Sequence, residues 1–253
     1  MLWSLSAWRR VPDTGDPLRR SRAPGSPHSL RAMDYSGFDA LTFDCYGTLI
    51  DWERGILAAL PAGLDGERVL EAYAEIESEL EAGEYLRYRE VVARCYDGLA
   101  SRFGLAADGR DAFADAVGDW PPFPDSADAL ARLKERFRLG VITNCDDDLF
   151  ARSNARLGVD FDWVITAQQV GAYKPSPRGF EEAFSRMDVP RERILHVAQS
   201  LFHDHVTATR LGLSTVWIDR RGGRAGGATP AAEAKPDATF SDMASFADAA
   251  TKR

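Results

Sequence analysis

The chain switches between two hydrophobic periods. Short, continuous apolar runs rich in β-branched residues predict buried strands, whereas apolar residues three or four positions apart predict helices. The first apolar run, residues 41–43, ends at Asp44, and Gly47-Thr48 breaks the pattern just beyond it. Later strands are predicted at residues 139–143, 163–166, 194–198 and 214–218, with 238–240 as a candidate edge strand.

A long helical stretch interrupts the strands. From residue 53 to about 118, apolar residues recur at helical spacing, most clearly at 56–60, 69–80 and 85–103. The Pro-rich stretch 120–125 cannot continue a helix, because proline lacks the backbone N–H and forces its predecessor into extended geometry. We therefore predict a helical cap at residues 53–119, inserted into a core made of residues 33–52 and 120–253.

Strands and helices alternate in the second half of the chain. Helices are predicted around Ala127–Arg136, from an N-cap at Asp146 to Gly158, from an N-cap at Ser176 to Met187, and from about His205 to Gly212. This alternation is typical of parallel βαβ units. The predicted fold class is α/β, with a doubly wound, Rossmann-like parallel sheet as the core and the helical cap inserted into it.

Residues 1–32 differ from the rest of the chain. They are rich in arginine, carry scattered Pro, Ser and Gly, and have no periodic apolar face, so we predict a disordered N-terminal extension. The segment is Arg-rich like a transit peptide, but its prolines and acidic residues suit an amphipathic helix poorly. Translation from Met33 is the simpler account of the same pattern.

Composition narrows the class of protein. The 253 residues are 45% hydrophobic, which suits a globular α/β protein, and their net charge of −8 argues against binding to nucleic acid. The cysteines Cys45, Cys95 and Cys145 are far apart and form no metal or disulfide motif, which favours a reducing cytoplasm. No apolar run approaches the length of a membrane span, and the sequence leaves dimerisation open.

Polar side chains follow the strands of the predicted sheet. Asp44, Thr143-Asn144, Lys174-Pro175, and Ser200 with Asp204 each come after a strand. The carboxyl ends of parallel strands meet at one edge of a sheet, so these groups are expected to converge despite their separation in sequence. A lone Asp-Gly-Thr turn or Lys-Pro pair is usually an ordinary loop, but four such groups in order indicate an active site.

The stretch Phe43-Asp44-Cys45-Tyr46-Gly47-Thr48-Leu49 resembles the first motif of the haloacid dehalogenase superfamily of hydrolases. The later polar groups match the remaining motifs in order over residues 37–245. Ile165-Thr166-Ala167-Gln168 and Ala172-Tyr173-Lys174-Pro175 are similar to 2-haloacid dehalogenases and their azetidine-2-carboxylate hydrolase relatives.

The resemblance implies roles for the matched residues. Asp44 would be the nucleophile that forms a covalent ester, Lys174 the positive charge beside it, and Asp204 the group that holds Lys174 or orients water. Further polar side chains would bind the substrate, a small carboxylate, or steady the nucleophile. These candidate substrate-binding residues are Tyr46, Thr48, Thr143, Asn144 and Ser200.

Tyr46 separates two branches of the superfamily. Phosphatases of this superfamily place a second Asp there to protonate the leaving alkoxide, and a phenol with an ordinary pKa of about 10 is a poor substitute. They also supply two acids for magnesium near the fourth motif, where this chain offers Asp204 alone. We therefore expect no metal and no cofactor. His203 and His205 flank Asp204, but local hydrogen bonding explains such a pair better than metal binding.

One departure from the dehalogenase pattern lies in the predicted cap. About thirty residues after the nucleophile, 2-haloacid dehalogenases place an Arg that receives the halide, whereas this chain has Glu75, Glu77, Glu79 and Glu81. Arg87 and Arg89 on the following helix are candidates for that charge, and a solvated helix face explains them equally well.

The expected activity is dehalogenation of a 2-haloacid at its α-carbon. Opening of an azetidine-like ring by C–N cleavage follows the same mechanism and is the nearest alternative. A phosphatase that tolerates Tyr46 and a non-catalytic binding protein of the same fold are the remaining alternatives, although binding alone requires neither Asp44 nor Lys174.

Overall fold

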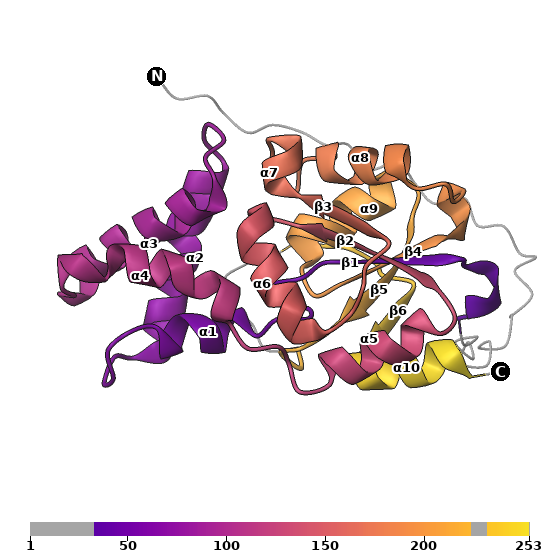
Figure 1. Ribbon diagram of the computed structural model, residues 1–253, viewed down its shortest axis with the longest axis horizontal. Coiled ribbons are helices and arrows are strands. Elements are labelled where there is room, and N and C mark those ends of the chain that lie inside the picture. The colour runs from indigo at the N-terminus through magenta and orange to yellow at the C-terminus, as the bar shows by residue number, and fades with distance from the viewer. Residues whose placement is uncertain (1–32, 224–231, 253) are drawn as a thin grey trace, which may run out of the picture. The chain divides into compact units, whose positions relative to one another are not determined.

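The computed structural model describes residues 33–223 and 232–252, which belong to one compact body (Figure 1). The predicted extension 1–32 and most of the loop predicted at 222–228 lie outside the described residues. The strands are β1 Ala40–Phe43, β2 Arg138–Thr143, β3 Trp163–Thr166, β4 Ile194–Ala198, β5 Ser214–Ile218 and β6 Ala238–Phe240. All six form one parallel sheet in the order β3-β2-β1-β4-β5-β6, which confirms the predicted fold class.

The strand order creates a crevice beside β1. The chain runs outward from β1 through β2 to β3, then crosses back to place β4, β5 and β6 on the other side. Phe43 is aligned with Val141 of β2 and with Val197 of β4, so the residues that follow these strands emerge at the same edge. Ligands bind at such a reversal point in open α/β sheets.

Alternating side chains divide the core between the two faces of the sheet. Leu41 and Phe43 of β1 contact one hydrophobic cluster, and Ala40 contacts the other. The first cluster is covered by α5 Ser126–Lys134, α6 Asp147–Leu157 and α10 Met243–Thr251, and the second by α8 Arg178–Arg186 and α9 Val206–Arg210. Figure 1 shows α8 and α9 on the face opposite α5 and α10. A single helical turn, α7 Ala167–Val170, follows β3.

The insertion between β1 and β2 is helical, as predicted. It contains α1 Trp52–Ala58, α2 Gly66–Glu81, α3 Tyr88–Phe103 and α4 Arg110–Asp115, with short 3₁₀ turns at Ala107–Gly109 and Ala116–Asp119. Asp51 and Asp65 begin α1 and α2 by accepting backbone N–H groups. The exact division into cap and core stays a prediction.

The chain enters and leaves the insertion at one place. Asp51 N–H donates to the Pro121 carbonyl at 2.8 Å, and Phe123 N–H donates to the Leu49 carbonyl at 3.0 Å. The turn that leads from Asp44 into this pairing passes through Gly47, whose φ of +93° suits glycine. The Pro-rich stretch therefore marks the return from the insertion.

Three predicted helix starts differ in detail. Asp146 precedes α6, but its carboxylate accepts instead from the N–H groups of Tyr88 and Arg89 at the start of α3, at 3.1 and 3.0 Å. The N-cap of α8 is Pro177 and not Ser176. The helix predicted from His205 is preceded by a π-helical turn, Leu201–His205, and α9 begins at Val206. Within the described ranges, no helix is both long and apolar enough to cross a membrane.

Candidate active site

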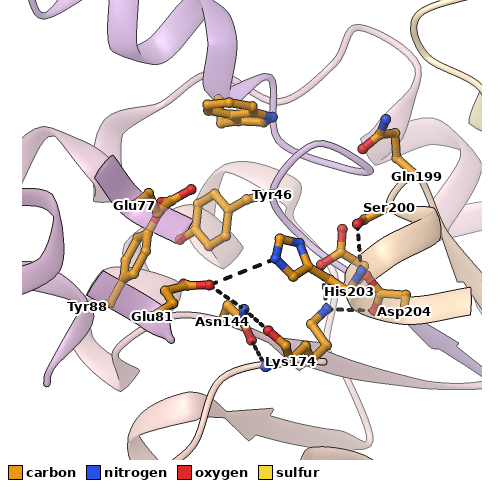
Figure 2. Close-up of a pocket in the computed structure, with 12 residues that line it drawn as sticks. Tyr46, Glu77, Glu81, Tyr88, Asn144, Lys174, Gln199, Ser200, His203 and Asp204 are labelled. Carbon is orange, nitrogen blue, oxygen red and sulfur yellow. Dashed lines mark hydrogen bonds and ion pairs between the residues drawn. The ribbon is translucent and has the colours of Figure 1, made fainter. Parts of the chain in front are cut away.

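A cavity of about 60 Å³ lies where the polar residues after β1, β2 and β4 meet residues of the insertion (Figure 2). It is lined by Asp44, Tyr46, Trp52, Glu77, Glu81, Tyr88, Asn144, Lys174, Gln199, Ser200, His203 and Asp204. Six of the eight site residues predicted from the sequence are among them. The exceptions are Thr48 and Thr143.

Lys174 connects the two buried aspartates of the cavity. Its Nζ donates to Asp44 Oδ1 at 2.7 Å, to Asp204 Oδ1 at 2.7 Å and to the Ile142 carbonyl at 2.9 Å. The ammonium has three protons, so all of its donors are used. The Lys174 side chain is only 4% exposed. This arrangement fixes the carboxylate of Asp44 relative to a permanent positive charge.

Burial and neighbouring charges have opposite effects on the pKa values of Asp44, Lys174 and Asp204. Burial raises the pKa of Asp44, and the adjacent Lys174 ammonium opposes that rise. Burial likewise disfavours the charge on Lys174, but Asp204 and Asp44 raise its pKa above the ordinary value. Despite burial, Lys174 and His196 hold the pKa of Asp204 below its usual range. Lys174 and Asp204 are therefore charged near neutral pH.

Thr48 holds the other oxygen of the candidate nucleophile. Its hydroxyl donates to Asp44 Oδ2 at 2.6 Å and accepts from the Gln199 N–H at 2.9 Å. The Asp44 N–H donates to the Val197 carbonyl, which continues the β1–β4 pairing by one residue. Thr48 is fully buried and positions Asp44 from behind the cavity.

His196 of β4 was not predicted as a site residue. Its Nε2 donates to Asp204 Oδ1 at 3.1 Å, and its Nδ1 lies 3.0 Å from Thr42 Oγ1. The available signal was a polar residue in the otherwise apolar strand Ile194–Ala198. Within the described structure, Asp204 Oδ2 is buried with no hydrogen-bond partner. His196 therefore positions Asp204 through one oxygen and leaves the other unused.

Asn144 and Ser200 support the loops around the cavity. Asn144 Oδ1 accepts from the Lys174 N–H at 2.7 Å, and its Nδ2 donates to the Lys174 carbonyl at 3.2 Å. Ser200 Oγ accepts from the His203 N–H at 3.0 Å, which leaves the hydroxyl proton available to a ligand. Thr143 lies outside this cavity, in a smaller one behind Lys174.

The Tyr46 hydroxyl is directed toward α6. It lies 2.9 Å from Ser153 Oγ and accepts from Cys145 Sγ at 3.3 Å. Burial raises the pKa of Tyr46 well above its ordinary value. A phenol held in this way is a poor proton donor at neutral pH.

Two glutamates of α2 form the opposite wall of the cavity, and neither was predicted as a site residue. Glu77 Oε1 accepts from the hydroxyls of Tyr73 and Tyr88 at 3.0 and 2.8 Å. Glu81 Oε2 makes only long contacts, 3.4 Å to Asn144 Nδ2 and 3.9 Å to His203 Nε2. Burial raises the pKa of Glu77 to about 7 and that of Glu81 well above its ordinary value. These side chains come from the predicted cap, and their approach depends on how α2 packs.

Arg87 and Arg89 lie at the protein surface. Arg87 donates to Gln168 Oε1 at 2.8 Å, and Arg89 pairs with Asp115 at 2.6 Å and with Asp148 at 2.7 Å. Neither arginine lines the cavity. Of the two alternatives, the solvated helix face agrees with the structure.

The histidines beside Asp204 face different partners. Burial lowers the pKa of His203 to about 4, so its imidazole is neutral where it approaches Glu81. His205 Nε2 lies 2.9 Å from the Ala198 carbonyl. Across residues 33–223 and 232–252, no group of three or more His, Cys, Asp or Glu side chains is placed to hold a metal ion.

Curated proteins of similar sequence include dehalogenases and a phosphatase. The (S)-2-haloacid dehalogenase of Pseudomonas putida is 27% identical over 197 residues, which covers 72% of this chain and 85% of the relative. The glyceraldehyde 3-phosphate phosphatase of Methanothermobacter thermautotrophicus is 38% identical over only 101 residues, 39% of this chain and 45% of the relative.

Solved structures share the fold. The L-2-haloacid dehalogenase of Xanthobacter autotrophicus is 21% identical, with a TM-score of 0.71 over 83% of this chain and 97% of that one. A second dehalogenase structure, 20% identical, has a TM-score of 0.76 over 86% of this chain and 99% of that one.

A sequence model of haloacid dehalogenase-like hydrolases matches residues 38–199, more than half of the chain. The matched range includes Asp44, Asn144 and Lys174, and the sheet order and dehalogenase relatives agree with it. The chain belongs to the haloacid dehalogenase-like hydrolases.

Proposed function

We propose that this hydrolase acts as a 2-haloacid dehalogenase does, with Asp44 attacking the α-carbon of a small carboxylic acid. The observation that carries the proposal is the placement of Asp44, whose two oxygens are held by Lys174 and Thr48 at the edge of the cavity. A carboxylate fixed between a charge and a hydroxyl is prepared to attack without reorganising.

The reaction proceeds through an ester. An Asp44 oxygen bonds to carbon, the carbon–halogen bond breaks, and the electron pair leaves with the halide. Water then attacks the carboxyl carbon of the ester, and the hydroxy acid departs with a former Asp44 oxygen while a proton passes to solvent. Lys174 stabilises the Asp44 carboxylate before the attack and again after hydrolysis of the ester, and Asp204 holds Lys174 in place.

The state of Tyr46 supports substitution at carbon over phosphate ester hydrolysis. An alkoxide leaving group needs a proton, and the Tyr46 phenol is engaged with Ser153 and Cys145 and is poorly acidic. A halide leaves without a proton. The paired Asp44 and Lys174 also argue against a purely binding role, because burying such a pair is costly unless it serves a purpose.

Known dehalogenases support the covalent step. The Xanthobacter autotrophicus L-2-haloacid dehalogenase has been solved with chloropropionic acid covalently bound. The same attack in this chain would place a short acid against Ser200 and Gln199, which line the cavity and carry hydrogen-bond donors.

Cleavage of a C–N bond, as in azetidine-2-carboxylate hydrolysis, is a second candidate. It is favoured by Glu77 and Glu81, which stand where a halide-binding arginine would be expected. A ring ammonium already carries the proton with which its nitrogen departs, so this reaction also needs no acid from Tyr46.

Single-turnover labelling in ¹⁸O-water tests the covalent route. With enzyme in excess over 2-chloropropionate or azetidine-2-carboxylate, the product should be unlabelled, and the peptide that contains Asp44 should gain ¹⁸O. Label in the product would show that water attacks the substrate directly. Asp44→Asn should retain the fold and lose almost all activity, because an amide is a far weaker nucleophile.

A further inference from the structure

The lining of the cavity carries more negative groups than positive ones. Asp44, Asp204, Glu77 and Glu81 all line it, and Lys174 is the only permanently charged cation among its described lining residues. With all four carboxyls ionised, the net charge of the cavity would be −3. Such an excess is strongly unfavourable in a buried site unless a proton or a ligand compensates it.

Glu81 is the carboxyl with the weakest partners. Its side chain is 9% exposed, its hydrogen bond to Asn144 Nδ2 is long at 3.4 Å, and neutral His203 lies 3.9 Å away. Glu77, by contrast, receives two tyrosine hydroxyls on one oxygen. A strong hydrogen-bond donor would therefore stabilise this buried carboxyl, because its present partners compensate little of the cost of burial.

A second carboxyl that lines the cavity has one oxygen without a partner among the described residues. Asp204 lines the cavity and is fully buried, and among the described residues nothing donates to its Oδ2. His196 and Lys174 both bind the other oxygen, Oδ1. Figure 2 shows Glu81 and Asp204 as walls of one pocket that also contains Lys174 and His203. Two carboxyl groups that line the cavity, Glu81 and Asp204, therefore each lack a strong donor to one oxygen among the described residues.

We propose that Glu81, with Glu77 one turn before it on α2, forms a subsite that binds a protonated nitrogen of the substrate beside the carbon that Asp44 attacks. The orientation rests on the proposed attack by Asp44. A protonated amine supplies the N–H donors and the positive charge that the cavity lacks, whereas a halide would face the glutamates. Of the two candidate reactions, this subsite favours C–N cleavage, in which the amine is the leaving group, over release of a halide.

Binding of a protonated amine at this subsite should change the protonation of Glu81. The titratable groups around it are Glu77, Tyr88, Cys95, Tyr173, Lys174 and His203. Burial and Glu77 raise the pKa of Glu81, which favours its protonated form when the cavity holds no ligand, whereas pairing with an ammonium favours the ionised form. Binding of a cation should therefore release a proton.

Calorimetry on the Asp44→Asn protein tests the subsite without turnover. L-azetidine-2-carboxylate and cyclobutanecarboxylate have the same ring size and the same carboxylate, and only the first carries a ring ammonium. We expect the first to bind about tenfold more tightly near neutral pH. In buffers of different ionisation enthalpy, its binding should also release a proton.

Adding Glu81→Gln to the Asp44→Asn protein should abolish both the preference and the proton release, while Glu79→Gln on the exposed side of α2 should change neither. Should Glu81→Gln fail to fold, Glu81→Asp, which shortens the reach by one methylene, should still lose most of the preference. Equal affinity for the two acids, or a preference that survives in Glu81→Gln, would overturn the proposal. Product labelled with ¹⁸O, together with a Glu81-dependent preference, would refute attack by Asp44 and leave the subsite intact.

Discussion

At the scale of single residues, we expect Asp204 to influence the proposed reaction through Lys174. Lys174 shares its charge between two carboxylates, and His196 holds Asp204 in place. In Asp204→Asn the amide oxygen can still accept from Lys174, but one of the two negative charges is lost. We expect kcat to fall about 10²-fold with KM little changed, because the ammonium is no longer fixed against Asp44. Steady-state kinetics against Asp128→Asn, an exposed control on α5, measure the effect.

Tyr46, unlike Asp204, is a residue whose substitution should change kcat little. If it donates no proton, Tyr46→Phe removes only the hydrogen bonds to Ser153 and Cys145 and should cost about 1 kcal/mol of stability. A general acid contributes roughly 10²- to 10⁴-fold to the rate, so kcat should fall by less than about 10²-fold. A larger loss, with a changed alkaline limb of the pH profile, would make Tyr46 an acid and favour phosphate ester hydrolysis.

The protonation of Glu77, which lines the cavity, makes the stability of the fold depend on pH. Burial raises its pKa to about 7, so the folded protein holds this proton more tightly than the unfolded chain does. The stabilisation is complete below the ordinary pKa of a glutamate and is lost as pH rises through about 7. Glu77→Gln cannot ionise and escapes that loss. Relative to the parent, the free energy of unfolding of the variant should rise across this window by up to about 3 kcal/mol.

Urea unfolding at a series of pH values measures the difference between Glu77→Gln and the parent. Glu79→Gln, exposed on the same helix, serves as the control and should follow the parent at every pH. Parallel curves for Glu77→Gln and the parent would show that Glu77 titrates normally in the folded protein.

The sequence predicted the residues that share a motif and missed those that depend on packing. Asp44, Lys174 and Asp204 follow strands, so the topology of the sheet alone brings them to one edge. Glu77 and Glu81 lie four and eight residues after Tyr73, so helical spacing places them on the face of α2 that Tyr73 shares, but glutamates are usually solvated. Their exposure depends on the contacts that α2 makes with the rest of the protein.

At the scale of elements, Asp146 joins α3 to the loop after β2. Its two oxygens accept the N–H groups of Tyr88 and Arg89, which would otherwise remain unbonded at the helix start. Asp146→Ala should therefore lower the free energy of unfolding by about 2 kcal/mol, since it removes a cap and leaves buried donors unpaired.

Asp65→Ala is the matched control for Asp146→Ala. Asp65 caps α2 through one exposed bond of 3.3 Å to the Arg68 N–H, so its loss should cost about 1 kcal/mol or less. Urea unfolding compares the two variants. Equal losses would show that the link between α3 and Asp146 adds nothing beyond an ordinary cap.

Helix prediction succeeded where large apolar residues set the period. The helices of the insertion and the helix after β2 were found within a few residues, whereas α10 was not predicted. Its buried positions Met243, Phe246, Ala247 and Ala250 have helical spacing, but two of the four are alanines, which give a weak hydrophobic signal. The partner of the Asp146 carboxylate was also missed, because it lies 58 positions away in sequence.

At the scale of the whole molecule, the described fold is anchored from its first residues. Asp34 accepts from the Ser36 N–H to begin the turn Tyr35–Gly37, and Tyr35 is 7% exposed. The Tyr35 ring meets Phe246 of α10 edge to face, with centroids 5.9 Å apart. The start of the described chain therefore packs against its last helix.

The contact between Tyr35 and Phe246 allows the deletion of residues 1–32 to be compared with a deletion that removes a buried side chain. Their sequence has no apolar face to bury, so a protein that begins at Met33 should match the full chain in Tm and in kcat/KM. A deletion that continues through Gly37 removes Tyr35 from its contact with Phe246 and should cost about 2 kcal/mol or more. Thermal unfolding of the three proteins separates the contributions. If the first deletion lowers Tm as much as the second, residues 1–32 carry stabilising contacts of their own, and the core begins earlier than Met33.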